Sequence, residues 1–403
     1  MTNAPATLPL YLPAAVLPPL PPAPAPEGAV DAAVAAALLA DREDDDDAGD
    51  GAYCSSMQAG GHRPDPDNPE QGYHGPHYGA RTKLFATTAR LTLLPPPALD
   101  SAEYLEALRE VRGRGIAPQL MGTVPPSIPR RAVDETLIGL YWGYDGAKQL
   151  GTPPRLYNQI VRQVADKEDN DPAANARLFA FVNAAMADAG ILAWAEKYKH
   201  DLWRPVVGIR EHDASMGPAG GSGNDISTDC DTGWLPLGAP STDSLEAATM
   251  HAYPCQQMRR EVVKNFTPPF PAYPSGHATF GAAALHVTRR FYGVADGNRA
   301  ADPLFDDEAF TSEELDGVSR DNLGTVRPKH ARRFDGGLWD MIVENGESRV
   351  FLGVHWVFDA FVRAANGSPD LTQNIGGTPL GLAIAENIFT AGNGEAPKKS
   401  TVL

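Results

Sequence analysis

The segment Phe270-Pro-Ala-Tyr-Pro-Ser-Gly-His277 joins a proline-rich, extended run to an apolar stretch, 278–292. Pro274 is expected to end the extended run, and Ser275 has the short hydroxyl side chain that favours a helix N-cap. The first turn of a helix presents unpaired N–H groups and the positive end of the helix dipole, so an anion binds there at low cost. Gly276 lets an oxyanion approach the backbone, and His277 can give or take a proton. The segment therefore predicts either an oxyanion site or an ordinary capped helix.

An upstream segment contains two cations that could help to complete such a site. Lys197 and Arg204 are seven residues apart, and seven steps along a helix end about 20° short of two full turns. This spacing predicts that both side chains lie on one face of a helix, which Pro205 ends just beyond Arg204. The alternative is a solvated basic face, because Lys199 and His200 lie between them.

A downstream segment contains a third cation and a second histidine. Arg349 is followed by His355 within an otherwise apolar stretch, and Asp359 comes four residues later. One helical turn would bring the Asp359 carboxylate to the imidazole, where it could orient the ring. The alternative is that His355 is an ordinary core histidine.

Together, the patterns Lys-x6-Arg-Pro, Pro-Ser-Gly-His and Ser-Arg-x5-His-x3-Asp resemble those of the vanadium-dependent haloperoxidases, and within that family the fungal vanadium chloroperoxidases. Type 2 phosphatidic acid phosphatases and bacterial acid phosphatases share the architecture of this site. The likeness covers roughly residues 60–390 and includes the segments 139–146, 151–161, 234–240 and 314–320.

The resemblance implies an all-α fold, a helical bundle of the haloperoxidase and acid phosphatase type. Members of the family are built from two related bundles, and this chain is expected to have a missing or truncated first bundle. Either another copy of the chain in a homo-oligomer would then cover the apolar face left open, or the sequence comes from an incomplete gene model. The implied cofactor is vanadate, and the implied substrates are hydrogen peroxide and a halide, namely chloride, bromide or iodide, which is oxidised to hypohalous acid.

The resemblance also implies roles for individual residues. His355 is expected to bind vanadium through a ring nitrogen, and His277 to act as the acid–base group, assisted by Lys197 as a second catalytic residue. The oxygens of vanadate are expected to be held by the side chains of Lys197, Arg204, Ser275 and Arg349, the Gly276 amide and His277.

Four further residues are expected to support the site. Phe270 and Trp194 match an apolar halide pocket, and a Phe at position 270 is typical of enzymes that oxidise chloride. Asp145 is expected to pair with Arg349, and Asp359 to orient His355. Ordinary core aromatics and helix-surface carboxylates are the alternatives.

Two other functions share the same residues. In an acid phosphatase, His355 would attack phosphorus and His277 would protonate the leaving group. A catalytically silent oxyanion-binding protein is the second alternative.

Composition excludes several classes of partner and leaves other questions open. The net charge of −17 argues against nucleic acid or an anionic membrane surface. The sequence contains no run of about twenty apolar residues, so no membrane span is expected. The proline-rich N-terminus lacks a conventional signal peptide, so either secretion by another route or a cytoplasmic location is compatible with the sequence. The chain has three cysteines, Cys54, Cys230 and Cys255. Cys230 and Cys255 could form a disulfide or remain free thiols.

The predicted organisation has four parts: a disordered segment, 1–50, with a short Ala-rich helix at 29–39; a loop-rich segment with a short helix, 51–130; the vanadate-binding bundle, 131–392; and a flexible tail, 393–403. The insertion 206–269 includes an expected basic helix at 258–264. His62, His74 and His77 are expected to be surface or loop residues rather than ligands. Other helices are expected from about residue 102 and over 135–150, 155–165, 173–199, 276–292, 338–365 and 380–389.

Overall fold

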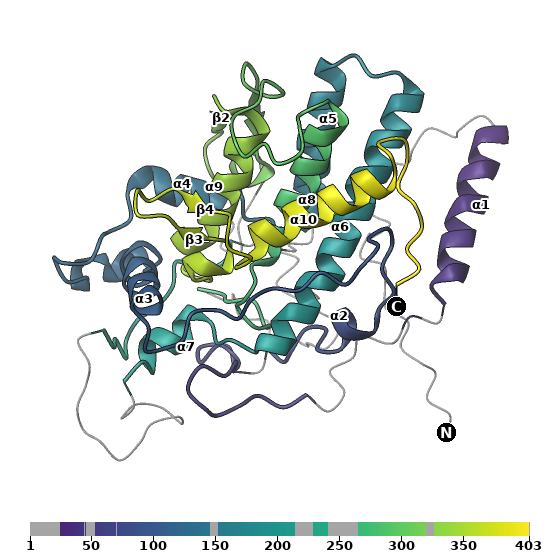
Figure 1. Ribbon diagram of the computed structural model, residues 1–403. Coiled ribbons are helices and arrows are strands. Elements are labelled where there is room, and N and C mark those ends of the chain that lie inside the picture. The colour runs from purple at the N-terminus through teal and green to yellow at the C-terminus, as the bar shows by residue number, and fades with distance from the viewer. Residues whose placement is uncertain are drawn as a thin grey trace.

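The computed structural model describes residues 25–43, 45, 53–69, 71–145, 152–213, 229–240, 265–319 and 326–402. These residues form a helical fold with two short antiparallel hairpins (Figure 1). The helices are α1 (Ala25–Asp41), α2 (Tyr78–Arg81), α3 (Ala102–Arg114), α4 (Val133–Tyr141), α5 (Pro153–Lys167), α6 (Pro172–His200), α7 (Pro205–Arg210), α8 (Gly276–Phe291), α9 (Gly337–Phe351) and α10 (Gly377–Ala391). Short 3₁₀ turns are η1 (Pro118–Thr123), η3 (Glu313–Leu315) and η4 (Val357–Asp359). The expected all-α class is confirmed.

Helix α8 is the centre of the bundle and packs against α5, α6, α9 and α10. Six of its residues between positions 276 and 284 are glycine or alanine, so neighbouring helices can approach this part closely. Gly377 and Gly381 of α10 face it, and a Cβ at either position would come within 2.4 Å of a backbone oxygen of α8 or its N-cap. The two glycines therefore let α10 cross α8 in close contact, as Figure 1 shows.

Helix α6 is the longest helix described and crosses the bundle beside α8 (Figure 1). Asp171 caps its N-terminus by accepting a hydrogen bond from the Ala174 N–H at 2.7 Å. Its C-terminus is closed by Asp201, which adopts the left-handed conformation with φ of 49°. Among the described residues, α6 alone is long and apolar enough to cross a membrane, and 61% of its most apolar window is buried inside the fold.

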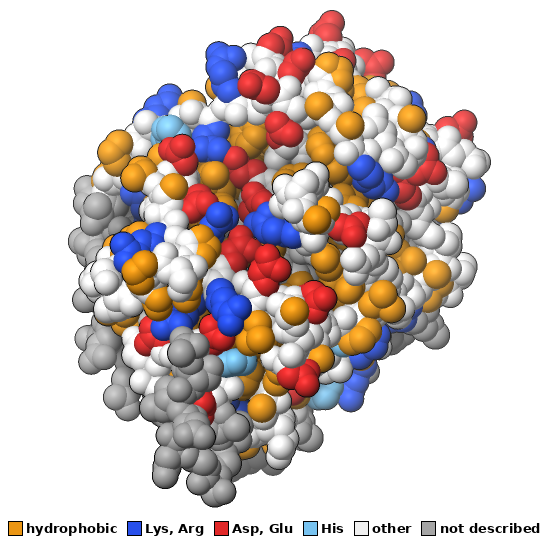
Figure 2. All heavy atoms as spheres, turned by 60° about the vertical axis from the view of Figure 1, so that its left-hand side comes forward, with side chains coloured by type: hydrophobic (Ala, Val, Ile, Leu, Met, Phe, Trp, Pro, Cys, Tyr) orange, Lys and Arg blue, Asp and Glu red, His pale blue; other side chains and the backbone are white. Residues whose placement is uncertain are grey.

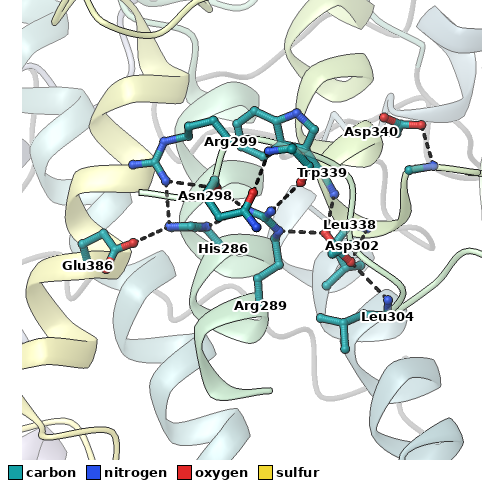
Figure 3. Close-up of polar contacts among 12 residues, drawn as sticks. His286, Arg289, Asn298, Arg299, Asp302, Leu304, Leu338, Trp339, Asp340 and Glu386 are labelled. Carbon is teal, nitrogen blue, oxygen red and sulfur yellow. Dashed lines mark hydrogen bonds and ion pairs between the residues drawn. The ribbon is translucent and has the colours of Figure 1, made fainter. Parts of the chain in front are cut away.

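The C-terminal end of α8 is joined to the start of α9 by a buried polar network (Figure 3). Arg289 of α8 donates to the Asp302 carboxylate at 2.7 Å, and that carboxylate also accepts from the Leu338 and Trp339 N–H groups in the first turn of α9. His286 lies between Arg289 and Glu386 of α10. The three helices are therefore tied together at the end of α8 far from Ser275.

The strands are short and lie outside the bundle. Strand β1 (Ala309–Thr311) pairs antiparallel with β2 (Ala331–Arg333), with Phe310 opposite Arg332. Strand β3 (Val362–Arg363) pairs antiparallel with β4 (Pro369–Asp370). Strand β1 leads directly into η3, and β3 packs beside η4.

Several expected boundaries were wrong. The helix expected over 135–150 ends at Tyr141, because the chain turns through Tyr144, whose φ is 47°. The helix expected over 338–365 ends at Phe351, and Gly353 follows with φ of 74°. The expected tail is held by hydrogen bonds from Ser400 to the Phe85 and Thr87 carbonyls.

The N-terminal expectations were only partly right, and one lies outside the described residues. Within the segment expected to be disordered, 25–41 forms α1, so the short Ala-rich helix is confirmed and is longer than expected. The segment 51–130 contains α2 and α3 rather than a single helix. The basic helix expected at 258–264, most of the insertion and Cys255 lie outside the described residues; Cys230 is a buried free thiol and Cys54 an exposed one.

The face that carries α3, α4 and the hairpins is rich in charge. Figure 2 shows side chains of both signs gathered on this side of the molecule. Arg363 of β3 pairs with Glu110 of α3 at 2.9 Å and with Glu347 of α9 at 2.8 Å, and Arg114 lies 3.3 Å from Glu135 of α4. Ion pairs therefore connect α3 with β3 and α4, and β3 with α9, on this face.

Candidate active site

Ser275 is the N-cap of α8, as its position in the sequence predicts. Its side-chain oxygen accepts from the Ala278 N–H at 3.4 Å, and its own N–H donates to the Asp359 carbonyl at 2.8 Å. Gly276 is the first residue of the helix, where backbone N–H groups point out of the N-terminus. A Cβ at Gly276 would lie 3.6 Å from the Trp194 ring and 3.9 Å from the Phe280 ring, so both rings face the helix start.

His277 has its backbone and its ring held by separate contacts. Tyr157 of α5 and Asn345 of α9 both donate to the His277 carbonyl, at 3.0 and 2.8 Å. Ring atom Nε2 lies 2.6 Å from the Gly143 carbonyl oxygen. A carbonyl can only accept, so Nε2 carries the hydrogen and Nδ1 has the free lone pair.

His355 is fixed in the opposite tautomer. Its Nδ1 lies 2.7 Å from the Asp359 carboxylate, which also accepts from the Trp356 N–H at 3.0 Å. Nδ1 therefore donates, and Nε2 presents its lone pair to Nη1 of Arg204 at 2.9 Å. Burial raises the pKa of Asp359 to about 7, and burial, followed by the nearby cations, lowers the pKa of His355. The imidazole is therefore neutral and offers Nε2 to an electrophile.

Lys197 and Arg204 converge, although the reason expected from the sequence was wrong. They do not share a helix, because α6 ends at His200 and Arg204 is the N-cap of α7. The left-handed turn at Asp201 instead brings both cations against one segment, 270–274. Lys197 donates to the carbonyls of residues 271, 272 and 274 at 2.9, 3.1 and 2.6 Å, and Arg204 donates to that of Phe270 at 2.8 Å.

Arg349 reaches the site from the last turn of α9. Its guanidinium is buried and pairs with Asp145, with contacts of 2.7 and 3.3 Å. Its charge is the largest cause, after burial, of the lowered pKa of His277. The pairing expected from the sequence is therefore present, and it holds the guanidinium next to the His277 ring.

Phe270 and Trp194 form an aromatic wall beside the cations. Their ring centroids are 4.8 Å apart, and Phe270 lies under both Lys197 Nζ, at 5.0 Å, and the Arg204 guanidinium, at 4.8 Å. His74 adds a third ring, edge-on to Trp194 at 5.9 Å. Burial lowers the pKa of His74 to about 4, so this ring is neutral at physiological pH.

His62 lies in a loop, as one of the two expected environments has it, but it is not at the surface. It is fully buried, and within the described part of the chain neither ring nitrogen has a hydrogen-bond partner. Its N–H donates to the Asp201 carbonyl at 2.9 Å, which places it beside the connection between α6 and α7. Burial, then the charges of Arg204 and Lys197, lowers its pKa well below the usual value.

The sequence-predicted residues thus meet in one buried site whose chemistry suits an oxyanion. Three cations, a helix N-terminus and a serine hydroxyl surround two neutral imidazoles, and such donors bind an anion rather than a metal cation. Burial, then the charge of Arg204, lowers the pKa of Lys197, as expected for a buried cation beside other cations. Nε of Arg349 has no hydrogen-bond partner within the described residues, so this buried donor can take an oxygen.

Sequence patterns did not single out Gly143, Tyr157 or Asn345 as parts of this site. Gly143 acts through a backbone oxygen, which has no sequence signal. Tyr157 and Gly143 lie in segments that carry the family resemblance, and Asn345 lies one helical turn before Arg349. Their closeness to these motifs was the one feature of the sequence that could have indicated them.

Comparison with known proteins supports the resemblance. Residues 177–369 match the family described as the VCPO second helical-bundle domain. The chain is 36% identical to vanadium chloroperoxidase from Curvularia inaequalis over 403 aligned positions, which cover 81% of this chain and 59% of that protein. Similar solved structures include a bacterial vanadium-dependent iodoperoxidase, with a TM-score of 0.48, 20% identity and coverage of 82% of this chain and 60% of the other. They also include a holo-form bacterial vanadium-dependent chloroperoxidase, with a TM-score of 0.45, 13% identity and coverage of 81% and 55%. The chain is therefore similar to a vanadium chloroperoxidase over most of its length, and residues 177–369 match the second helical-bundle domain of such proteins.

Proposed function

We propose that this chain holds orthovanadate and uses hydrogen peroxide to oxidise a halide to hypohalous acid. The observation that supports this most directly is the His355 ring, whose Nδ1 is committed to Asp359 while its Nε2 lone pair faces a cluster of cations. The chain spans about three fifths of the chloroperoxidase to which it is similar, so the activity of the whole relative is a proposal for this chain.

The residues of the site fit vanadate. Nε2 of His355 supplies one neutral nitrogen ligand, and the cationic groups of Lys197, Arg204 and Arg349 offset the charge of the oxyanion. The Ser275 hydroxyl and the first N–H groups of α8 complete the donor set. Nη1 of Arg204 and Nζ of Lys197 now donate to protein acceptors, and each has to exchange one of these hydrogen bonds for an anion oxygen.

Vanadate, when bound, supplies a Lewis acid that draws electrons from the peroxide, which makes it open to attack by a halide. The protein contributes proton transfer and charge. His277 is neutral and has Nδ1 free, so it can accept a proton from hydrogen peroxide and return it later. Lys197 provides a positive charge beside the reacting oxygens, and Phe270 and Trp194 keep water from that side.

Chloride is part of the proposal, together with bromide and iodide. Chloride is the hardest of the three to oxidise, so its approach has to be dry enough to remove part of its hydration. The Phe270 and Trp194 rings, which contact each other at a tilt of 48°, support such an approach. We expect bromide to react faster than chloride, because it loses electrons more easily.

Reconstitution tests the proposal. Apoprotein dialysed against orthovanadate should gain peroxide-dependent halide oxidation, which phosphate present during reconstitution suppresses and which chelators of divalent cations leave intact. Phosphatase activity that vanadate inhibits, without halide oxidation, would instead indicate an acid phosphatase with His355 as nucleophile. Neither activity, with tight vanadate binding, would indicate a silent oxyanion-binding protein.

A further inference from the structure

One short turn, Gly143–Asp145, contacts two groups of the site. The Gly143 carbonyl accepts from Nε2 of His277 at 2.6 Å, and the Asp145 carboxylate pairs with Arg349 at 2.7 Å. Tyr144, between them, has φ of 47°. A residue with a bulky side chain rarely adopts this left-handed conformation, which persists where the surroundings hold it in place.

The surroundings that hold this turn come from the segment 310–315. The Ser312 hydroxyl donates to the Tyr141 carbonyl at 2.6 Å, at the point where α4 ends. The Glu313 N–H donates to the Tyr144 hydroxyl at 3.0 Å. Oε1 of Glu314 accepts from the Tyr144 backbone N–H at 3.1 Å. Three successive residues therefore hold the chain at the end of α4 and at the strained position itself.

Glu314 is the member of this segment that lies against the turn itself. It is 1% exposed, and a Cβ added to Gly143 would come within 3.0 Å of its Oε1. Its other oxygen lies 3.2 Å from Nη1 of Arg327. The carboxyl group is thus fixed on one side by Arg327 and used on the other to hold Tyr144.

We propose that Glu314 is a positioning residue for the active site. As a buried hydrogen-bond acceptor it fixes the Gly143–Asp145 turn, and through the turn it sets the tautomer of His277 and the orientation of Arg349. Its effect on vanadate binding and catalysis rests on the proposed function. Its effect on the His277 ring does not, because the contact with Gly143 exists in the protein alone.

The role requires the acceptor oxygen and does not require the negative charge. Burial is the main cause that raises the pKa of Glu314 to about 8. A protonated carboxyl or an amide offers the same oxygen to the Tyr144 N–H, so Glu314→Gln should retain this contact while losing the one that Oε2 accepts from Arg327. Glu314→Ala leaves the Tyr144 N–H buried and unpaired. Glu314→Met fills a similar volume without an acceptor, and separates the loss of the hydrogen bond from the loss of packing.

Glu313→Ala is a matched control on the same 3₁₀ turn. Its carboxylate pairs with Arg155 at 2.7 Å and with the Gln159 amide, while its contact with Tyr144 uses the backbone N–H, which alanine keeps. Circular dichroism and thermal melting would first confirm that each variant is folded.

The first measurement is the protonation of His277 in the apoprotein, read from ¹⁵N chemical shifts of labelled imidazoles assigned with a His277→Gln variant. The parent protein, Glu314→Gln and Glu313→Ala should show hydrogen on Nε2, and Glu314→Met and Glu314→Ala should show a mixture of tautomers. Unchanged shifts in Glu314→Met and Glu314→Ala would overturn the proposal, whether or not the protein binds vanadate.

The second measurement is orthovanadate affinity by calorimetry, with kcat and KM for peroxide at saturating vanadate. Loss of a contact that orients a site residue typically costs ten- to a hundredfold in affinity or rate, so Glu314→Met should lose about that much in affinity and in kcat, with KM for peroxide little changed. Glu314→Gln should stay within about threefold of the parent. Equal losses in Glu314→Gln and Glu314→Met would show that charge matters and refute the acceptor role. An unaltered protein that binds no vanadate would refute the proposed function, and the tautomer result would still decide the role of Glu314.

Discussion

Replacing Asp302 with alanine should destabilise the fold by removing the centre of the network in Figure 3. Asp302 accepts from Arg289 at 2.7 Å and from three backbone N–H groups, those of Leu304, Leu338 and Trp339, at 3.0–3.2 Å. The Arg289 side chain is fully buried, so Asp302→Ala leaves a charge without its counter-ion inside the protein. Breaking a buried ion pair on one side costs about 3–5 kcal/mol.

This estimate can be turned into a melting temperature. Unfolding entropy scales with chain length, so 3–5 kcal/mol corresponds to a decrease of roughly 4–6 °C for a chain of 403 residues. Arg289 keeps contacts of 3.1 and 2.7 Å with the carbonyls of residues 298 and 300, which favours the lower half of this range. Differential scanning calorimetry would measure it, with Asp41→Asn as control, because Asp41 and Lys399 form an exposed pair whose loss should leave the midpoint unchanged.

A double-mutant cycle makes the reasoning open to refutation. In Arg289→Met/Asp302→Ala both partners are absent, so the combined loss should be smaller than the sum of the single losses by about 2 kcal/mol or more. Additive losses would show that the two side chains act independently. A midpoint for Asp302→Ala within 1 °C of the parent would show that the network adds little to stability, contrary to what its burial indicates.

Three further predictions concern the site. His355→Ala should greatly weaken orthovanadate binding in calorimetry, because His355 is the residue proposed to bind the metal. His277→Ala should retain binding and lose halide oxidation. Equal loss of binding in the two variants would contradict these roles. Phe270→His should depress chlorination more than bromination, because it adds a polar group to the dry wall next to Trp194, and parallel rate assays at mildly acidic pH would detect the difference. Glu314 has a pKa raised from 4.5 to about 8 on folding, so the folded protein holds this proton more tightly and loses stability as pH rises from about 4.5 to 8. Glu314→Gln should therefore show a shallower decrease in unfolding free energy over this range in urea titrations, and an unchanged slope would exclude the shift.

Local sequence patterns predicted the parts of the fold that depend on local physics. The N-cap at Ser275 and the helix that follows it were predicted because a hydroxyl residue before a long apolar run has few alternative structures. Helix α6 was predicted to within one residue at either end, because a single periodic stretch with an acidic N-cap covers it. The end at Tyr141 was missed, since that helix stops at a turn in which tertiary contacts hold Tyr144 at a positive φ. The end at Phe351 was missed although Gly353, a residue type that favours positive φ, follows it.

The clustering of the site residues was predicted from the family pattern, and its geometry was not. Helical spacing suggested that Lys197 and Arg204 share a face, yet the chain reverses at Asp201 between them. The two cations converge because both donate to carbonyls of 270–274, a segment 66–77 residues away in sequence. Spacing within one segment carries no information about such a partner, so the correct grouping was reached by an incorrect route.

The protonation of the two histidines shows where sequence reasoning ends and structure becomes necessary. The His355 tautomer could be anticipated, because its partner Asp359 is four residues away. The His277 tautomer depends on the backbone oxygen of Gly143, 134 residues earlier, and that oxygen is held in place by Glu314, 170 residues beyond Tyr144. A peptide carbonyl is present at every position, so residue type cannot identify the one that accepts this hydrogen bond. The fold therefore determines that Nδ1 of His277 is the nitrogen free to accept a proton. It does so through the Gly143–Asp145 turn, whose strained backbone no sequence pattern indicates.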